Sequence, residues 1–321
     1  MSFIQVEHLQ KSFTVRKKKE KKSLFREKEK IDALQDLSFQ IERGELVGYI
    51  GPNGAGKSTT VKILSGILTP ESRSVLIDGR IPWASRKEHV RHIGVVFGQR
   101  VQLWWDVPII DSYSLLKDIY LLPDTVYQKR LDELTEALQL GSLLRTPLRL
   151  LSLGQRMRAE LCGSLLHRPE LLFLDEPTIG LDSVSKLALR DFLEWENRTY
   201  GTTILLTTHD MEDIAALCSR VMVLGHGRKL FDGDFSKLLS RYDTSRTVLV
   251  RFEENVSASS FPDQLSVSRE GDNLKMVYSP QEMPTPELLA SLQRAGTIRE
   301  LTIQPQNIDH MIADMYQEMA L

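Results

Sequence analysis

A glycine-rich stretch with one lysine and two hydroxyl residues has the composition of a phosphate-binding site. It reads GPNGAGKST over residues 51–59 and directly follows the apolar run ELVGYI. Glycines let backbone N–H groups turn toward phosphate oxygens, the helix that follows presents its positive end, and a lysine adds charge. A glycine-rich turn is the alternative. The stretch predicts a nucleotide-binding loop, with Ser58 as a candidate magnesium ligand, made of Gly51, Pro52, Asn53, Gly54, Ala55, Gly56, Lys57, Ser58 and Thr59.

Two adjacent carboxylates follow another apolar run, LLFL at residues 171–174. At the end of a buried strand, Asp175 has the position from which phosphate-loop enzymes hold magnesium. Glu176 can orient or deprotonate a water for in-line attack on the γ-phosphate of a nucleotide. A simple Asp-Glu-Pro turn is the alternative interpretation. The presence of the phosphate loop in the same chain favours the catalytic one.

Short apolar runs alternate with helical patterns and must position these residues. Continuous apolar runs predict strands buried on both faces of a largely parallel sheet at 45–50, 93–97, 170–175, 202–207 and 220–224. Residues 2–8 and 34–41 alternate instead, which is typical of a half-exposed antiparallel sheet. Helical spacing dominates residues 108–168 and predicts a helical insertion.

The pattern changes after about residue 242. TVLVRF, LKMVY and TIRELTI are expected strands, and 285–294 and 306–318 are expected helices. The fold class is therefore α/β, with a domain at 1–242 and a small accessory α/β domain at 243–321. No metal or nucleophile pattern occurs in the second part.

Length and composition fit a globular protein of about two domains, with 321 residues, 41% hydrophobic and 26% charged. No apolar run approaches the roughly 20 residues that span a bilayer, and the start lacks a secretory pattern. The two cysteines, Cys162 and Cys218, have no ligand-like spacing, which fits a reducing cytosol.

The order of the motifs resembles the ATP-binding cassette (ABC) ATPases. LSLGQ at 151–155 precedes FLDEPTIGLD at 173–182 and TTHD at 207–210, and the resemblance covers residues 3–240. It implies the phosphate-loop ABC ATPase fold, with a mixed sheet core, an antiparallel β subdomain and a helical subdomain at about 108–168. It also implies ATP and Mg²⁺ as ligands.

The resemblance assigns further roles residue by residue. Gln99 matches the loop glutamine that contacts magnesium and the attacking water, and His209 matches the switch histidine, although a helix cap is the alternative for His209. Residues 151–155 match the signature, which contacts the ATP of a second copy in a head-to-tail dimer, and residues 181–182 match the D-loop. The implied ATP contacts there are Ser152, Gly154, Gln155 and Asp182. Phe13 matches the residue that stacks on adenine, with core packing as the alternative.

Two positions depart from the family pattern. Leu153 replaces the commonest signature glycine, and Arg73 stands in a turn that the family usually fills with glycine. We expect activity to survive, because Ser152, Gly154 and Gln155 remain. The stretches around Gln99 and the signature look like a bacterial subfamily that pairs with exporter-like, type-two permeases.

An adjacent tryptophan pair marks a candidate docking surface for such a permease. Trp104 and Trp105, together with Arg100, flank the position where the family receives a permease helix. Local packing under the helical subdomain is the alternative for the tryptophans.

The sequence thus predicts the ATP-hydrolysing subunit of an exporter, peripheral on the cytoplasmic face of the inner membrane and working with separate permease subunits. A soluble ABC ATPase that acts on ribosomes or nucleic acid is the alternative. The single phosphate loop and single signature disfavour it, so no nucleic acid partner is expected.

Charge is distributed unevenly along the chain. Residues 16–30 hold nine basic and three acidic residues, a net of +6, which leaves −8 for the rest of a chain whose total is −2. Such a segment predicts either a solvated hairpin or a contact with anionic lipid headgroups or an acidic permease loop.

Overall fold

The computed structural model describes residues 2–17, 27–71, 75–98, 100–208, 210–242, 245–254, 256–257, 261–262, 265–306 and 308–318. The chain forms two compact units, Met1–Asp234 and Phe235–Leu321. Helix α8 (Phe235–Tyr242) belongs to the second unit, whereas the sequence pattern predicts a first domain that extends to residue 242. The amphipathic helix carries no signal that assigns it to one core or the other.

A six-stranded sheet forms the centre of the first unit. Its order is β5 (Ile93–Phe97), β6 (Leu171–Asp175), β7 (Thr203–Thr207), β3 (Leu46–Ile50), β8 (Arg220–Gly225) and β9 (Arg228–Asp234). All neighbours are parallel except β8 and β9. The five strands expected from apolar runs are confirmed. The polar strand β9 has no such run and was not expected.

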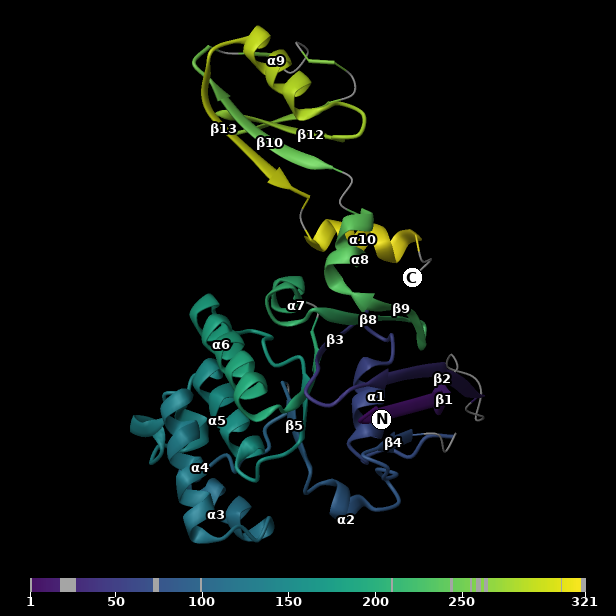
Figure 1. Cartoon of the computed structure of the whole chain (residues 1–321), viewed down its shortest axis with the longest axis vertical. Coiled ribbons are helices and arrows are strands. Elements are labelled where there is room, and N and C mark those ends of the chain that lie inside the picture. Colours follow the sequence, from purple (N-terminus) through teal and green to yellow (C-terminus); the bar gives the residue numbers. More distant parts are fainter. Residues whose placement is uncertain are drawn as a thin grey trace, which may run out of the picture. The chain divides into compact units, whose positions relative to one another are not determined.

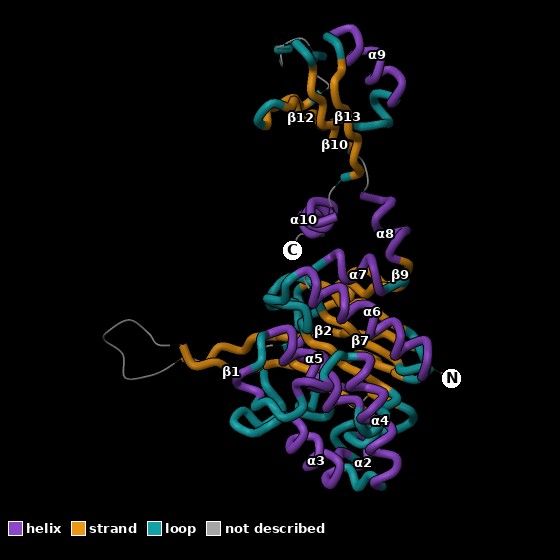
Figure 2. Tube along the Cα trace, turned by 90° about the vertical axis from the view of Figure 1, so that its left-hand side faces the viewer, coloured by secondary structure: helices purple, strands orange, loops and turns teal. Residues whose placement is uncertain are grey.

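A smaller antiparallel sheet has the order β2 (Glu27–Ile41), β1 (Ile4–Lys17) and β4 (Val75–Ile77). The alternating patterns at 2–8 and 34–41 are confirmed as antiparallel partners, in strands longer than expected. The far ends of β1 and β2 extend beyond the rest of the unit (Figure 2). Side chains of this sheet share one buried cluster with the central sheet and with α1 (Lys57–Leu64). Residues 18–26, which hold most of the basic segment, and Arg73 lie outside the described residues.

Helices α3 (Ile109–Ile119), α4 (Asp124–Ala137) and α5 (Leu153–Leu165) form the expected helical insertion. They gather with α6 (Ser183–Tyr200) at one side of the unit, and β1, β2 and β4 lie at the other (Figure 1). The described part of the unit also contains the short α-helices α2 (Arg86–His89) and α7 (Met211–Leu217) and short 3-10 helices at Gly141–Leu143 and Leu148–Leu150. Among the described residues, no helix combines the length and apolar character that crossing a membrane requires.

The second unit is an antiparallel sheet with helices. Its order is β11 (Ser266–Glu270), β12 (Asn273–Tyr278), β10 (Arg246–Phe252) and β13 (Ile298–Pro305). Helix α9 (Thr285–Ala295) buries Leu288 and Leu292 in the same cluster as Val248 and Val250 of β10. Helix α10 spans Ile308–Glu318. Strand β11 was not expected because its residues are mostly exposed and polar.

Candidate nucleotide-binding and hydrolysis site

The phosphate loop joins the end of β3 to the start of α1, as a phosphate site requires. Gly56 has a φ of 105°, and a Cβ there would lie 2.6 Å from Leu34 Cδ2, so only glycine fits. Lys57 Nζ donates to the carbonyl oxygen of Gly51 at 2.6 Å. Burial lowers the pKa of Lys57, and the carboxylates of Glu176 and Asp175 oppose this shift. The loop thus holds a buried ammonium group beside the N-terminus of α1, and a helix N-terminus and a positive charge together suit a polyphosphate.

Oxygen donors from three elements converge on Asp175 at the end of β6. Its Oδ1 accepts from Ser58 Oγ of α1 at 3.2 Å and from Thr207 Oγ1 of β7 at 2.7 Å. A hydroxyl and a carboxylate at this separation are the hard ligands that Mg²⁺ takes beside substrate phosphates. The donor set therefore fits the metal. The contribution of Thr207 was not expected, because the sequence does not reveal which strands are neighbours.

Glu176 sits in a backbone conformation that few residues adopt. Its φ is +56°, in the left-handed region, which costs on the order of 1–3 kcal/mol. The Glu176 N–H donates to Thr207 O at 2.9 Å, which holds it against β7. On the other side a Cβ on Gly98 would overlap the Glu176 carbonyl oxygen, so glycine is needed at the end of β5. Two strand ends thus fix the direction of this side chain.

Two hollows, of about 300 and 320 Å³, share Asn53, Ser58 and Glu176. Arg100 and Gly98 line the first. Phe13 lines the second together with the phosphate loop, and its exposed fraction is 38%. Core packing is therefore wrong for Phe13. Ile31, which pairs with Phe13 across β1 and β2, lines the same hollow and was not expected, because only the strand register reveals it.

The signature begins α5, and its polar side chains cap that helix. Ser152 Oγ accepts from Gln155 N at 3.2 Å, and Gln155 Oε1 accepts from Ser152 N at 2.9 Å. Gly154 lies against the Ser185 side chain, where a Cβ would overlap Oγ. Leu153 is 41% exposed. Of the described residues that line the two hollows, none belongs to the signature.

The remaining expected site residues lie around these elements. Asp182 begins α6 as its N-cap, where Oδ1 accepts from Ser185 N at 2.8 Å, and these hydrogen bonds lower the pKa of Asp182. Gln99 and His209 lie outside the described residues, so their roles stay predictions. Asp210, next to His209, caps α7.

Trp104 and Trp105 are each 44% exposed. The Arg156 guanidinium lies 4.4 Å from the centroid of the Trp105 ring. Arg156 therefore covers one face of the Trp105 ring. Much of the surface of both tryptophans remains exposed to solvent. Arg100 lines the hollow beside Glu176.

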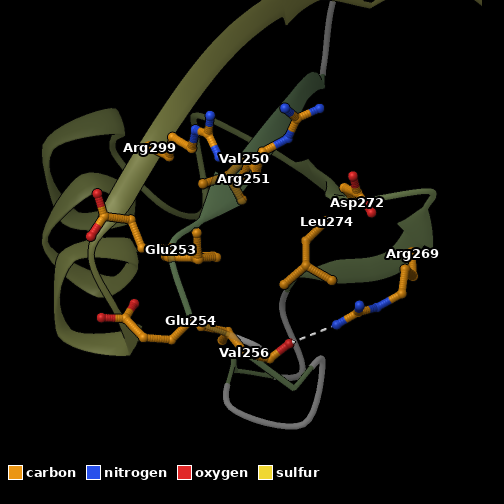
Figure 3. A pocket seen from close by; sticks show the side chains of 10 residues that line it. Val250, Arg251, Glu253, Glu254, Val256, Arg269, Asp272, Leu274 and Arg299 are labelled. Carbon is orange, nitrogen blue, oxygen red and sulfur yellow. Dashed lines mark hydrogen bonds between the residues drawn. The ribbon is translucent and has the colours of Figure 1, made fainter.

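A further hollow of about 270 Å³ lies in the second unit (Figure 3). Three basic and three acidic residues line it: Arg251, Arg269 and Arg299, and Glu253, Glu254 and Asp272. Arg269 donates to Val256 O at 3.1 Å, and Glu254 accepts from Thr297 N at 2.9 Å. Equal numbers of opposite charges do not favour an anion or a cation, and we assign no ligand to it.

Comparisons with known proteins agree with this geometry. The ABC transporter family model matches residues 34–179. The uncharacterized ABC transporter ATP-binding protein YhcH of Bacillus subtilis is 28% identical, over 89% of this chain and 91% of that protein. The cobalt import ATP-binding protein CbiO of Rhodobacter capsulatus is 36% identical, over 65% of this chain and 76% of that protein.

The chain is also similar to a protein named for export and to a solved dimeric structure. The Nod factor export ATP-binding protein I of Ralstonia nicotianae is 34% identical, over 70% of this chain and 73% of that protein. A dimeric ATP-binding cassette, solved in a post-hydrolysis state with ADP and Pi, aligns with a TM-score of 0.62 at 25% identity, over 72% of this chain and 98% of that one. The chain therefore belongs to the ABC transporter family, as an ATP-binding subunit that hydrolyses ATP.

Proposed function

We propose that the chain is the ATPase subunit of a bacterial exporter and works at the cytoplasmic face of the inner membrane with separate, type-two permease subunits. The observation that carries the proposal is that the signature lies apart from the other residues expected to bind ATP. Phosphate loop, Asp175 and Glu176 meet at one place, whereas the signature, at the start of α5, lines neither hollow there. Such a chain needs a second copy to complete each site. Relatives named for export and for cobalt import match the chain about equally, so the proposed direction of transport rests on the resemblance of the stretches around Gln99 and the signature to the exporter-type subfamily.

ATP lies across the two hollows in this proposal. The phosphate loop surrounds the β- and γ-phosphates, with Lys57 turning from the Gly51 carbonyl to a phosphate oxygen. The adenine ring would contact the Phe13 and Ile31 side chains of the antiparallel sheet, which line the same hollow. Mg²⁺ fits beside Ser58 and Asp175, and when bound it neutralises phosphate charge. By resemblance, Gln99 joins these two residues.

Hydrolysis is assigned to Glu176. Its fixed backbone, between β5 and β7, aims a carboxylate at the hollow beside Ser58, where it accepts a proton from the attacking water. His209 is the proposed partner of the γ-phosphate through its match to the switch histidine. The N-terminus of α5, with Ser152, supplies N–H groups to the γ-phosphate of the other copy. Two copies thereby close around two ATP molecules, and reopening follows hydrolysis.

The second unit, Phe235–Leu321, is proposed as an accessory domain. It holds none of the residues assigned to ATP. A division at Asp234/Phe235 replaces the boundary at residue 242 that the sequence favours.

Permease association tests the transport function. We expect the tagged chain to copurify with integral membrane proteins from detergent-solubilised membranes of its own host. Replacing both Trp104 and Trp105 by Ala should reduce that yield at least about tenfold, because paired exposed aromatic side chains are typical binding hot spots. Mass spectrometry of the eluates measures the yield.

Val126→Ala, an exposed apolar residue of α4, is the control and should leave the yield unchanged. Equal permease yields from the tryptophan variant and the wild type would contradict the docking surface. Copurification of ribosomes in place of membrane proteins would contradict the transport function and favour the soluble alternative.

Adenine stacking gives a separate prediction. Phe13→Ala should weaken ATP binding by about 1 kcal/mol, or roughly fivefold in Kd, because the base loses one aromatic face. Phe13→Tyr keeps that face and should bind ATP like the wild type. Titration with a fluorescent ATP analogue measures both. Unchanged affinity in Phe13→Ala would show that the base lies elsewhere.

A further inference from the structure

The segment between β5 and α3 lies along one face of α5. Residues 101–107 form neither helix nor strand. Arg156, Glu160 and Gly163 of α5 hold this segment, at positions that share one helix face because they are four and three residues apart. The Arg156 guanidinium covers the Trp105 ring, and a Cβ on Gly163 would lie 3.0 Å from Leu103 Cδ2.

Glu160 joins α5 to the first residues of this segment, whereas Trp104 N donates to Ser112 Oγ of α3 at 3.2 Å and Trp105 O accepts from Arg149 N at 3.0 Å. Glu160 Oε1 and Oε2 accept from Gln102 N at 3.0 and 3.1 Å, and Oε1 also accepts from Leu103 N at 3.2 Å. The side chain is only 5% exposed. Arg156 on the same helix and Tyr113 on α3 are the titratable groups that interact with it. A buried carboxylate thus binds two successive backbone N–H groups of the segment.

Glu160 joins the segment 101–107 to α5, and each of these two elements is connected to residues of a proposed ATP site. The segment follows β5 and Gly98, whose N–H donates to Asp175 O at 2.8 Å, beside the hydrolysis site. Ser152 is the N-cap of α5 and lies four and eight residues before Arg156 and Glu160, so it stands at the N-terminal end of the helix face that these two residues share. A displacement of residues 101–107 is therefore transmitted to α5, the helix that begins with the signature.

We propose that Glu160 is a positioning residue for ATP hydrolysis: its carboxylate fixes residues 102–103 to α5, so that Ser152 moves together with the segment that carries Trp104 and Trp105. This inference rests on the proposed function, in which Ser152 contacts the ATP of a second copy and the tryptophans contact the permease.

Protonation of Glu160 opposes this role. Burial raises its pKa from the ordinary value of 4.5 to about 7, against the opposing effects of the Leu103 and Gln102 N–H groups and Arg156. A protonated carboxyl carries no negative charge, so its hydrogen bonds from the Gln102 and Leu103 N–H groups lose their charge assistance and the fixation weakens as the pH falls below 7. Folding has the opposite dependence, because a raised pKa means that the folded state binds the proton more tightly than the unfolded state. The contribution of Glu160 to stability is therefore lost as the pH rises from about 4.5 to about 7. Glu160→Gln stays neutral at every pH and should lose no stability, so unfolding would not explain a loss of turnover in it.

Glu160→Gln in the full chain is the test, since Gln resembles the protonated form. We expect kcat at pH 8 to fall about 3- to 10-fold, the usual range for a change in coupling between sites. KM for ATP should stay within about twofold of the wild-type value, because Glu160 contacts no part of the phosphate loop. The wild-type kcat should fall as the pH drops through about 7, and the variant should lack this step. Its urea midpoint at pH 8 should be no lower than that of the wild type.

Acrylamide quenching of Trp104 and Trp105 fluorescence reports on the segment directly. The signal of the other tryptophans, measured in a variant with both Trp104→Phe and Trp105→Phe, is subtracted. Quenching should increase in the wild type as the pH falls through 7, a result that needs no Glu160 variant to fold. Glu136→Gln on α4, an exposed residue, is the matched control for kcat. A wild-type kcat and pH profile in Glu160→Gln, or quenching that does not change with pH, would overturn the positioning role. Full turnover in Glu176→Gln would instead show that the proposed hydrolysis site is wrong.

Discussion

Glu176→Gln is expected to lower ATP turnover by about 100- to 10,000-fold while the protein still binds ATP, because the amide cannot accept the proton of the attacking water. The substitution keeps the shape of the side chain and the backbone hydrogen bond from Glu176 N to Thr207 O. ATP should therefore bind normally and accumulate in a closed dimer of two copies. Phosphate release measures turnover, and size-exclusion chromatography with ATP measures the dimer.

Glu194→Gln, on the exposed side of α6, is the matched control and should retain wild-type turnover. Steady-state hydrolysis at the wild-type rate in Glu176→Gln would refute the assigned base. Loss of ATP binding in the same variant would indicate instead that Glu176 serves the phosphate loop.

Local sequence predicted the parts of the site that single elements build. The loop 51–59 needs only a strand before it and a helix after it, and Asp175 needs only a buried strand to carry it. The loop and the strand that carries Asp175 each depend only on consecutive residues of the sequence. The same holds for the five apolar strands of the central sheet. The family motifs added the signature, which no spacing rule would identify.

Contacts between distant segments could not be predicted in this way. Ile31 reaches the ATP hollow because of the β1–β2 register, and Thr207 reaches Asp175 because β6 and β7 are neighbours. Glu160 looks like one polar residue of an amphipathic helix until the segment at 102–103 is placed beside it. Helix α8 could belong to either unit, since its amphipathic pattern does not say which core it joins.

Glu196→Ala is expected to destabilise the first unit by about 3–5 kcal/mol, because it leaves a buried arginine without its main partner. Arg130 on α4 has an exposed fraction of 0% and Glu196 on α6 has 1%, and their closest atoms, Nη2 and Oε1, are 2.7 Å apart. Arg130 Nε also donates to Leu165 O of α5 at 3.3 Å, so one guanidinium joins three helices. The urea dependence of tryptophan fluorescence measures the loss, and all four tryptophans lie in the first unit.

The same helix supplies the control that separates burial from charge. Glu194 pairs with Arg198 at 2.6 Å on the exposed surface of α6, and Glu194→Ala should cost only about 0.5 kcal/mol because solvent screens that pair. Arg130→Met combined with Glu196→Leu removes both buried charges and should recover most of the stability that Glu196→Ala loses. If the double variant were as unstable as Glu196→Ala, the loss would come from altered packing of α4 against α6. In that case the ion pair would not be the main link between α4 and α6.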